Sequence, residues 1–322
     1  MIITKTPLRI SFTGGGTDLP DYYLKKGGAV VSAGINKHIY ITVNKKFDSK
    51  IRVSYSSTEI VDEVNELRHE LVRECLRLVG IKGGIEITSI ADIPAGTGLG
   101  SSSTFTVGLL NALHTYIGYR PSAEELAQQA CEIEINVLKH PIGKQDQYAA
   151  AYGGMNYFQF NADESVTRHR IFLDDANARA MRQKLMLFYT GITRSADGIL
   201  REQKQNTAAR METLDFMKKQ ADEMFWELTE HGFSEAFGEA LHQGWLRKQS
   251  LASSISNGLI NEYYEKALGA GAVGGKLLGA GGGGFLLLYC DEGNQIDVEK
   301  AVGLSRIDFR PSLRGSQVIF FA

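Results

Sequence analysis

The order of apolar and polar residues predicts a chain that mixes strands and helices. Residues 2–12 alternate and then run apolar, which predicts a strand that ends at a glycine turn at 14–16. Runs rich in Val, Ile, Thr and Tyr predict further strands, and a short apolar run at 185–190 is expected to be buried. The further strands are predicted in residues 28–44, 51–55, 84–90, 153–172, 284–290 and 317–321.

Apolar residues at intervals of three and four predict helices between these strands. One such pattern covers residues 59–79 and stops at Gly80. Ser122, followed by Glu125 three positions later, forms a capping box that predicts the start of a helix reaching about residue 138. The other predicted helices run from the serines near 103 to about 117, and through 196–231, 234–268 (weakened at Gly258) and 294–302.

The length favours two domains, because 322 residues exceed the roughly 100–200 of one typical domain. We expect a boundary near residues 175–185, and assign 1–180 to a first domain and 181–322 to a second. Hydrophobic residues make up 43% of the chain and charged residues 22%, as in ordinary globular proteins, which excludes intrinsic disorder as the whole answer.

Charge and cysteine content exclude several classes of protein. The 35 basic and 37 acidic residues give a net charge of −2, so no basic excess points to nucleic acid or to an anionic membrane surface. No apolar stretch approaches about 18 residues, and the N-terminus lacks the apolar core of a signal peptide. Cys75, Cys131 and Cys290 lie far apart, which argues against a disulfide framework or a zinc site and fits a reducing cytoplasm.

The 35 glycines gather in clusters that carry candidate chemistry. The segment PAGTGLGSSS, residues 94–103, lies between a predicted strand and a predicted helix. Glycines there let backbone N–H groups turn toward an anion, and the helix N-terminus adds unpaired donors. No Gly-Lys-Ser/Thr ending is present, which excludes a Walker A loop, and the spacing differs from a Rossmann fingerprint. The alternative is a capped turn that opens an ordinary helix.

Three carboxylates near polar turns are candidate functional groups. Asp18 follows the glycine turn 14–16 and could accept hydrogen bonds from a polyol, or could stabilise its own turn. Asp146, in the polar loop 143–147, could accept a proton from a substrate hydroxyl, although an Asp in such a loop is usually only solvated. Glu134, in the preceding helix, is available to Mg²⁺, which prefers hard oxygen ligands.

A last glycine run, residues 279–284, stands before the predicted strand 284–290. Four consecutive glycines between apolar segments indicate that the backbone approaches a ligand closely. A flexible loop is the alternative interpretation.

Taken together, these segments resemble the GHMP kinase family: galactokinase, homoserine kinase, mevalonate kinase and phosphomevalonate kinase. Residues 94–102 resemble its second, ATP-binding motif, residues 7–18 its first motif and residues 276–284 its third. The resemblance covers nearly the whole chain. It implies an α+β fold, with a ribosomal-S5-like N-terminal domain and a ferredoxin-like C-terminal domain. It also implies cytoplasmic, ATP- and Mg²⁺-dependent phosphorylation of a small-molecule hydroxyl.

The resemblance also implies roles for individual residues. Asp146 matches the catalytic aspartate of the sugar kinases, and Arg9 the basic residue that helps polarise the accepting hydroxyl. Ser102 and Glu134 match the metal-binding pair. The implied ATP-binding residues are Pro94, Gly96, Gly98, Leu99, Gly100, Ser101, Ser102 and Ser103. The implied acceptor-binding residues are Gly16, Thr17, Asp18, Gly281 and Gly282.

The implied acceptor is a sugar or sugar phosphate. Galactokinases carry Gly-Glu-His where this chain has three glycines at 14–16, which argues against galactose. The segments GGGTD, GKQDQ and TGITRSA resemble the heptose-phosphate kinases of the family, which implies phosphorylation of the anomeric hydroxyl of D-glycero-D-manno-heptose 7-phosphate for nucleotide-activated heptose synthesis. A second phosphate needs its own cations, for which Lys144 and Arg194 are candidates. The alternatives are a fucokinase-like kinase of a neutral sugar, a small-molecule decarboxylase of the family and a non-catalytic ATP- and sugar-binding regulator.

Overall fold

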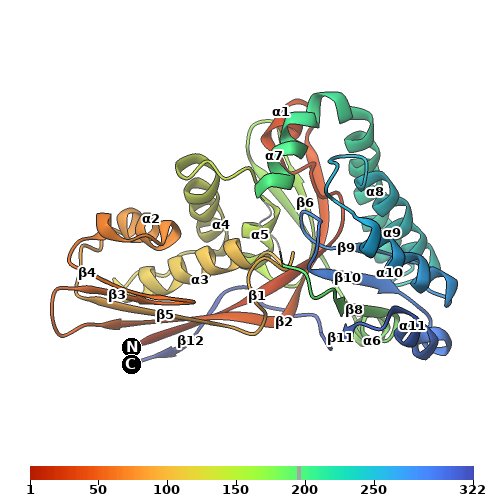
Figure 1. The fold of residues 1–322 in the computed structure, drawn as a ribbon. Helices are drawn as coiled ribbons and strands as arrows, with labels where there is room; N and C mark the ends of the chain where they lie inside the picture. The colour runs from red at the N-terminus through yellow and green to blue at the C-terminus, as the bar shows by residue number, and fades with distance from the viewer. Residues whose placement is uncertain (194–196) are drawn as a thin grey trace.

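Two β-sheets organise the chain in the computed structural model, which describes residues 1–193 and 197–322 (Figure 1). The first sheet contains β1 (Ile2–Thr13), β2 (Gly28–Lys45), β3 (Ile51–Ser54), β4 (Thr58–Val61), β5 (Ile85–Ala91), β6 (Met155–Phe160), β7 (Val166–Ile171) and β12 (Gln317–Phe321). The second contains β8 (Leu185–Tyr189), β9 (Gly274–Leu277), β10 (Phe285–Tyr289) and β11 (Ser305–Arg306).

Helices fill most of the intervening chain. The helical segments before β6 are α1 (Pro20–Lys26), η1 (Val64–Glu66), α2 (Glu70–Val79), α3 (Ser101–Tyr116), α4 (Ala123–Cys131), η2 (Glu132–Val137) and α5 (Gln145–Tyr152). The later segments are α6 (Asp175–Lys184), α7 (Asp197–Asn206), η3 (Thr207–Arg210), α8 (Met211–Glu230), α9 (Glu235–Lys248), α10 (Gly258–Gly269), η4 (Glu292–Asn294) and α11 (Gln295–Val302). No helix among the described residues is long and apolar enough to cross a membrane.

The long strand β2 connects the two halves of the first sheet. Its residues 28–33 pair with β6 and its residues 39–45 pair with β5, while β1 lies along its other edge. All pairings in this sheet are antiparallel except that of β3 with β5. The helix α3 packs on β1 and β2 and is buried along most of its length, as its apolar composition requires (Figure 1).

The second sheet has the strand order β11-β8-β10-β9, all antiparallel. The central strand β10 has the apolar sequence FLLLY, and every one of its residues is buried. Helices α8 and α9 pack against each other; α8 contacts β1 and β2, and α9 contacts β1 and β9. This pair therefore connects the second sheet to β1.

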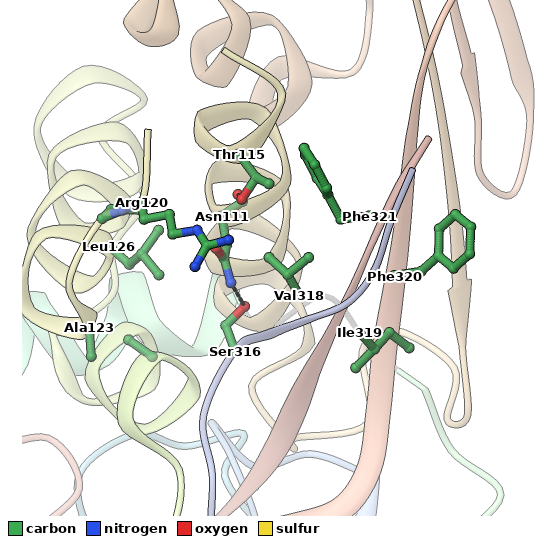
Figure 2. A pocket seen from close by; sticks show the side chains of 12 residues that line it. Asn111, Thr115, Arg120, Ala123, Leu126, Ser316, Val318, Ile319, Phe320 and Phe321 are labelled. Atoms are coloured by element: carbon green, nitrogen blue, oxygen red, sulfur yellow. Dashed lines mark hydrogen bonds between the residues drawn. The ribbon is translucent and has the colours of Figure 1, made fainter. Parts of the chain in front are cut away.

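The last strand, β12, returns to the first sheet and pairs with β1, so that the two chain ends lie side by side (Figure 1). A cavity of about 420 Å³ lies between β12 and the C-terminal end of α3, where the Asn111 amide donates a hydrogen bond to Ser316 Oγ at 3.0 Å (Figure 2). The expected domain division at residues 180 and 181 stays a prediction. All strands before residue 180 belong to the first sheet, and β12, from the end of the chain, joins the same sheet.

The single helix predicted over 59–79 is wrong in its first half. Residues 58–61 form β4, which pairs with β3, and the α-helix begins only at Glu70. The Glu59 carboxylate accepts the backbone N–H groups of Arg68 at 2.6 Å and His69 at 3.1 Å, which fixes the chain before the helix. Strand pairing and this side-chain capping outweigh the helical spacing of the apolar residues.

Other elements differ in detail from the sequence prediction. The capping box of Ser122 and Glu125 is confirmed, but the helix that it opens ends as the π-helical segment η2. The helix expected over 234–268 is two helices, because Asn257 caps a new one by accepting the Ile260 N–H at 3.0 Å. The segment 143–147, expected to be a loop, contains the first turn of α5, so that Asp146 lies at a helix N-terminus.

Candidate active site

A cavity of about 710 Å³ brings together the segments that the sequence analysis singled out. The turn after β1, the glycine loop before α3, the start of α5 and the glycine run before β10 all contribute lining residues. Helices α7 and α9 contribute others. Residues from both sheets therefore meet in one site.

Arg9 and Asp146 form a bidentate ion pair in this cavity. Arg9 Nε donates to Asp146 Oδ1 at 2.7 Å, and Arg9 Nη2 donates to Asp146 Oδ2 at 2.6 Å. The third hydrogen bond of the guanidinium runs from Nη1 to the Gly98 carbonyl at 2.6 Å. Arg9 is 4% exposed and the Asp146 side chain 23%, so the carboxylate remains open to the cavity. The arginine thus fixes the direction of the carboxylate and links it to the glycine loop.

Asp18 is buried beside this pair and joins the turn after β1 to α5. Its carboxylate accepts the N–H of Gly16 at 2.9 Å, the N–H of Gln145 at 3.2 Å and the Gln145 amide at 3.4 Å. Burial and the neighbouring Asp146 charge raise the pKa of Asp18. Gly143 leaves room for this arrangement, since a Cβ there would lie 2.0 Å from Asp18 Oδ2. Asp18 therefore supports the turn and also lines the cavity.

Of the two residues before Asp18 in this turn, Gly16 lines the cavity and Thr17 stabilises the turn. Gly16 lines the cavity and has φ +99, in the region that favours glycine. Thr17 is buried, and its hydroxyl donates to the carbonyls of Gly14 at 2.8 Å and Ala29 at 2.9 Å. Thr17 does not line the cavity, so its bonds fix the turn.

The glycine loop before α3 presents backbone donors to the cavity. Gly96, Gly98 and Gly100 have φ of +76, +82 and +76, conformations that other residues rarely adopt. No described side chain caps α3, so the N–H groups of its first turn are free to bind an anion. The lining residues of this segment are Ala95, Gly96, Gly98, Gly100, Ser101, Ser102 and Ser103.

Two further residues of this loop shape it from behind. The Pro94 carbonyl accepts the Thr97 hydroxyl at 3.0 Å, and the Leu99 carbonyl accepts the Arg9 backbone N–H at 3.1 Å. Leu99 is buried in the core. Neither Pro94 nor Leu99 lines the cavity.

Glu134, a residue of η2, is a fully buried carboxylate that contacts the first turn of α3. It accepts the Ser102 hydroxyl at 2.6 Å and the Gln147 amide at 2.8 Å, and its position comes from the π-helical segment. Burial raises the pKa of Glu134, and no described Lys or Arg forms an ion pair with it. The described residues contain no group of three or more His, Cys, Asp or Glu that could hold a metal. The pair of Ser102 and Glu134 suits Mg²⁺, which often takes only one or two protein ligands.

The glycine run before β10 packs against other backbone. A Cβ on Gly279 would lie 2.4 Å from the Gly98 Cα, and one on Gly284 would lie 2.2 Å from the Thr97 carbonyl oxygen. Gly281 lines the cavity, whereas the Gly282 N–H donates to the Ile255 carbonyl at 2.8 Å and lies outside the lining. Gly279 and Gly284 approach the first glycine loop, whereas Gly279, Gly281 and Gly283 also line the cavity, so the approach of this run to a ligand stays a prediction.

Of the two expected phosphate-binding cations, Lys144 alone belongs to the residues that the structure describes. Lys144 Nζ donates to the Glu164 carbonyl at 3.0 Å and lies 4.7 Å from the centre of the Tyr23 ring, outside the cavity lining. The geometry therefore does not support Lys144 as a phosphate contact. Arg194 lies outside the described residues, and its expected role stays a prediction.

Sequence reasoning missed two lysines of the cavity. Lys248 and Lys276 are 6% and 5% exposed, and both line the cavity. Burial and the nearby Arg9 lower the pKa of Lys248 to about 8. Burial, Lys248 and Arg9 hold the pKa of Lys276 well below its usual range. Lys276 precedes the glycine run and could have been noticed there, but Lys248 ends an ordinary helix and carries no local signal.

Comparison with known proteins agrees with this geometry. Residues 66–154 match the GHMP kinases N terminal domain, and residues 224–305 match the GHMP kinases C terminal domain. D-glycero-alpha-D-manno-heptose 7-phosphate kinase of Campylobacter jejuni is 30% identical over 94% of this chain and 93% of its own length. L-fucokinase/L-fucose-1-P guanylyltransferase of Bacteroides fragilis is 29% identical over 89% of this chain, which spans 34% of that protein.

Solved structures share the fold over nearly the whole chain. A putative sugar kinase of Campylobacter jejuni superposes with a TM-score of 0.78 at 28% identity, covering 98% of this chain and 97% of its own. A D-glycero-D-manno-heptose 1-phosphate kinase from Bacteriodes thetaiotaomicron gives a TM-score of 0.82 at 24% identity, covering all of both chains. The two-domain α+β fold predicted from the sequence is thereby confirmed, and the chain belongs to the GHMP kinase family.

Proposed function

We propose that the protein is an ATP- and Mg²⁺-dependent sugar kinase that phosphorylates the anomeric hydroxyl of D-glycero-D-manno-heptose 7-phosphate, yielding the 1,7-bisphosphate. The observation that carries the proposal is the Arg9–Asp146 ion pair, which lies in one cavity with an uncapped helix N-terminus and a glycine loop. The name of the Campylobacter jejuni relative supports this acceptor.

The nucleotide side of the site would be the loop before α3. Its backbone N–H groups and the positive end of the helix dipole suit the phosphates of ATP. Ser102 and Glu134 would hold Mg²⁺, which when bound neutralises charge on the phosphates. A cation beside Glu134 would favour the charged form of its carboxylate, which burial disfavours.

The acceptor side would be organised by Asp146. Each of its oxygens receives one hydrogen bond from Arg9 and keeps a lone pair that can accept a hydroxyl proton. In the transfer, the hydroxyl oxygen bonds to the γ-phosphorus, the bond from that phosphorus to the ADP oxygen breaks, and the hydroxyl proton passes to Asp146. Arg9 holds the carboxylate in direction, and positioning supplies most of the catalysis in phosphoryl transfer.

The experiment is an ADP-release assay with a panel of acceptors. We expect D-glycero-D-manno-heptose 7-phosphate to give the highest kcat/KM, well above the unphosphorylated heptose, L-fucose and galactose. Efficient turnover of fucose without activity on the heptose phosphate would refute the acceptor and favour a fucokinase-like enzyme, a candidate that the Bacteroides fragilis relative supports. ADP release with none of the acceptors would leave the regulator as the better account.

A further inference from the structure

Lys248 and Lys276 line the cavity on the side of the second sheet and of the helix that packs on it. Lys248 is the last residue of α9, and Lys276 belongs to β9. The Lys276 ammonium donates to the Phe12 carbonyl at 2.7 Å, and the Lys248 ammonium donates to the Gly279 carbonyl. Neither lysine forms an ion pair with any described Asp or Glu. Two almost fully buried amines therefore have only neutral carbonyl partners.

The neighbouring carboxylates are already engaged by other groups. Asp146 receives both of its short hydrogen bonds from Arg9, which balances its charge. Asp18 accepts three hydrogen bonds from Gly16 and Gln145. Asp18 and Asp146 lie near enough to raise the pKa of Lys248 in part, but neither forms an ion pair with a lysine, and burial still keeps the pKa of both lysines below the usual value.

Burying a cation without a counterion is unfavourable, and two adjacent cations add mutual repulsion. The lowered pKa of each lysine is the direct expression of this cost. An anion bound between them would offset the repulsion and favour the charged form of both amines. A phosphate dianion fits best, since its charge matches two ammonium groups and lysine binds phosphate as a point charge.

We propose that Lys248 and Lys276 bind the phosphate group that the acceptor sugar already carries. The inference rests on the proposed kinase function and names the residues that select a phosphorylated acceptor. The other source of phosphate in this reaction is the nucleotide. The acceptor is favoured because the Lys276 ammonium binds the Phe12 carbonyl at the end of β1, and the turn that follows β1 supplies Gly16 and Asp18. The nucleotide has its own anion site at α3.

The test compares Lys248→Met and Lys276→Met with wild type, and uses Lys266→Met as the matched control because its ammonium pairs with Glu262 on the surface of α10, outside the cavity lining. Steady-state kinetics should show KM for heptose 7-phosphate raised at least about 10-fold in Lys248→Met, the scale of one lost charge-assisted contact. KM for ATP should change less than about twofold. The Lys266→Met enzyme should match wild type in both constants.

The outcomes separate the two phosphate sources. A raised KM for ATP with an unchanged KM for the sugar phosphate would assign the lysines to the nucleotide and overturn the proposal. Unchanged constants in both single variants would overturn it as well. Should Lys276→Met fail to fold, as judged by its thermal unfolding, Lys248→Met alone decides the question.

Calorimetry without ATP distinguishes this proposal from the proposed function. Wild type should bind heptose 7-phosphate more tightly than unphosphorylated heptose, and Lys248→Met should lose most of that difference. This result would support the phosphate site even if no turnover were found. Equal loss of affinity for both sugars in Lys248→Met would show that the lysine does not recognise the phosphate.

Discussion

Arg9 holds both carboxylate oxygens of Asp146, at 2.7 and 2.6 Å, although 137 positions separate the two residues in the chain. A bidentate pair of this kind fixes the plane of the carboxylate as well as its position. The same guanidinium reaches the Gly98 carbonyl, so the proposed proton acceptor and the proposed ATP loop are held by one side chain.

Replacing the proposed proton acceptor should abolish most activity while preserving the fold. The Asp146→Asn side chain keeps the size of the aspartate and loses its charge, so turnover should fall about 10²-fold or more. Steady-state kinetics and thermal unfolding measure the two effects. Turnover near that of wild type would remove Asp146 from the mechanism.

A conservative change at Arg9 tests the bidentate geometry. Arg9→Lys retains the positive charge but can no longer donate two parallel hydrogen bonds to Asp146 and a third to Gly98. We expect kcat to fall about 10-fold or more, in the range found when a catalytic group loses its positioning. If charge alone were required, Arg9→Lys would retain full kcat.

The proposed metal pair can be tested through the dependence of activity on Mg²⁺. Ser102→Ala and Glu134→Gln should both raise the Mg²⁺ concentration needed for half-maximal rate and should weaken the use of ATP more than the binding of sugar. The physical reason is that Ser102→Ala loses one hard oxygen ligand, whereas Glu134→Gln loses the negative charge of the other ligand. A titration curve identical to that of wild type in both variants would contradict the assignment.

The glycine loop should not tolerate a side chain at Gly98. A Cβ there would lie 2.5 Å from the Leu278 carbonyl oxygen, and the residue has φ +82. Gly98→Ala should therefore lower the free energy of unfolding by about 1–3 kcal/mol and impair ATP use. Gly258→Ala is the control, because Gly258 begins α10 with no atom within 4 Å of an added Cβ, and denaturant unfolding should show little change. Equal stability of the two variants would argue against the packing of the two glycine loops.

The pH dependence of activity should report Lys248. The pKa of Lys248 is about 8, so the free enzyme loses this charge above pH 8. The charged groups that face Lys248 are Arg9, Lys276, Asp18 and Asp146. The kcat/KM for the sugar phosphate should decline as pH rises past 8, and Lys248→Arg should extend activity to higher pH. A profile for Lys248→Arg that matches wild type would assign the decline to another group.

Stability should respond to pH in the opposite direction. The folded-state pKa of Lys248 lies below the ordinary 10.5, so the unfolded chain binds more protons between pH 8 and 10.5. Wild type should therefore gain stability relative to Lys248→Met as pH rises through this interval, and unfolding curves at several pH values measure the difference. A constant difference would mean that the buried amine is not titrating there.

The sequence predicted the parts of the site that have local signatures. The glycine loop before α3 and the turn after β1 are recognisable because each needs special residues at short spacing, whereas the role of Asp146 follows only from the resemblance to the GHMP kinases. The capping box at Ser122 is recognisable for the same reason, and the structure confirms it.

Features that depend on distant contacts could not be predicted in this way. Lys248 ends α9 as basic residues commonly do, and only the packing of α9 against β9 brings it into the cavity. Residues 58–61 have helical spacing but pair as a strand with β3. The glycine run 279–284 predicts a close approach to a ligand, and only the assembled structure reveals that Gly279 and Gly284 also pack against Gly98 and Thr97.

The central claim, transfer of phosphate to the anomeric oxygen of a phosphorylated heptose, is tested most directly by ³¹P NMR of the product. Incubation of the enzyme with ATP, Mg²⁺ and D-glycero-D-manno-heptose 7-phosphate should yield two phosphate signals on one sugar, one of them coupled to the anomeric proton, and Asp146→Asn should yield almost none. A new phosphate on any other oxygen, or ATP consumption without a second sugar phosphate, would contradict the account.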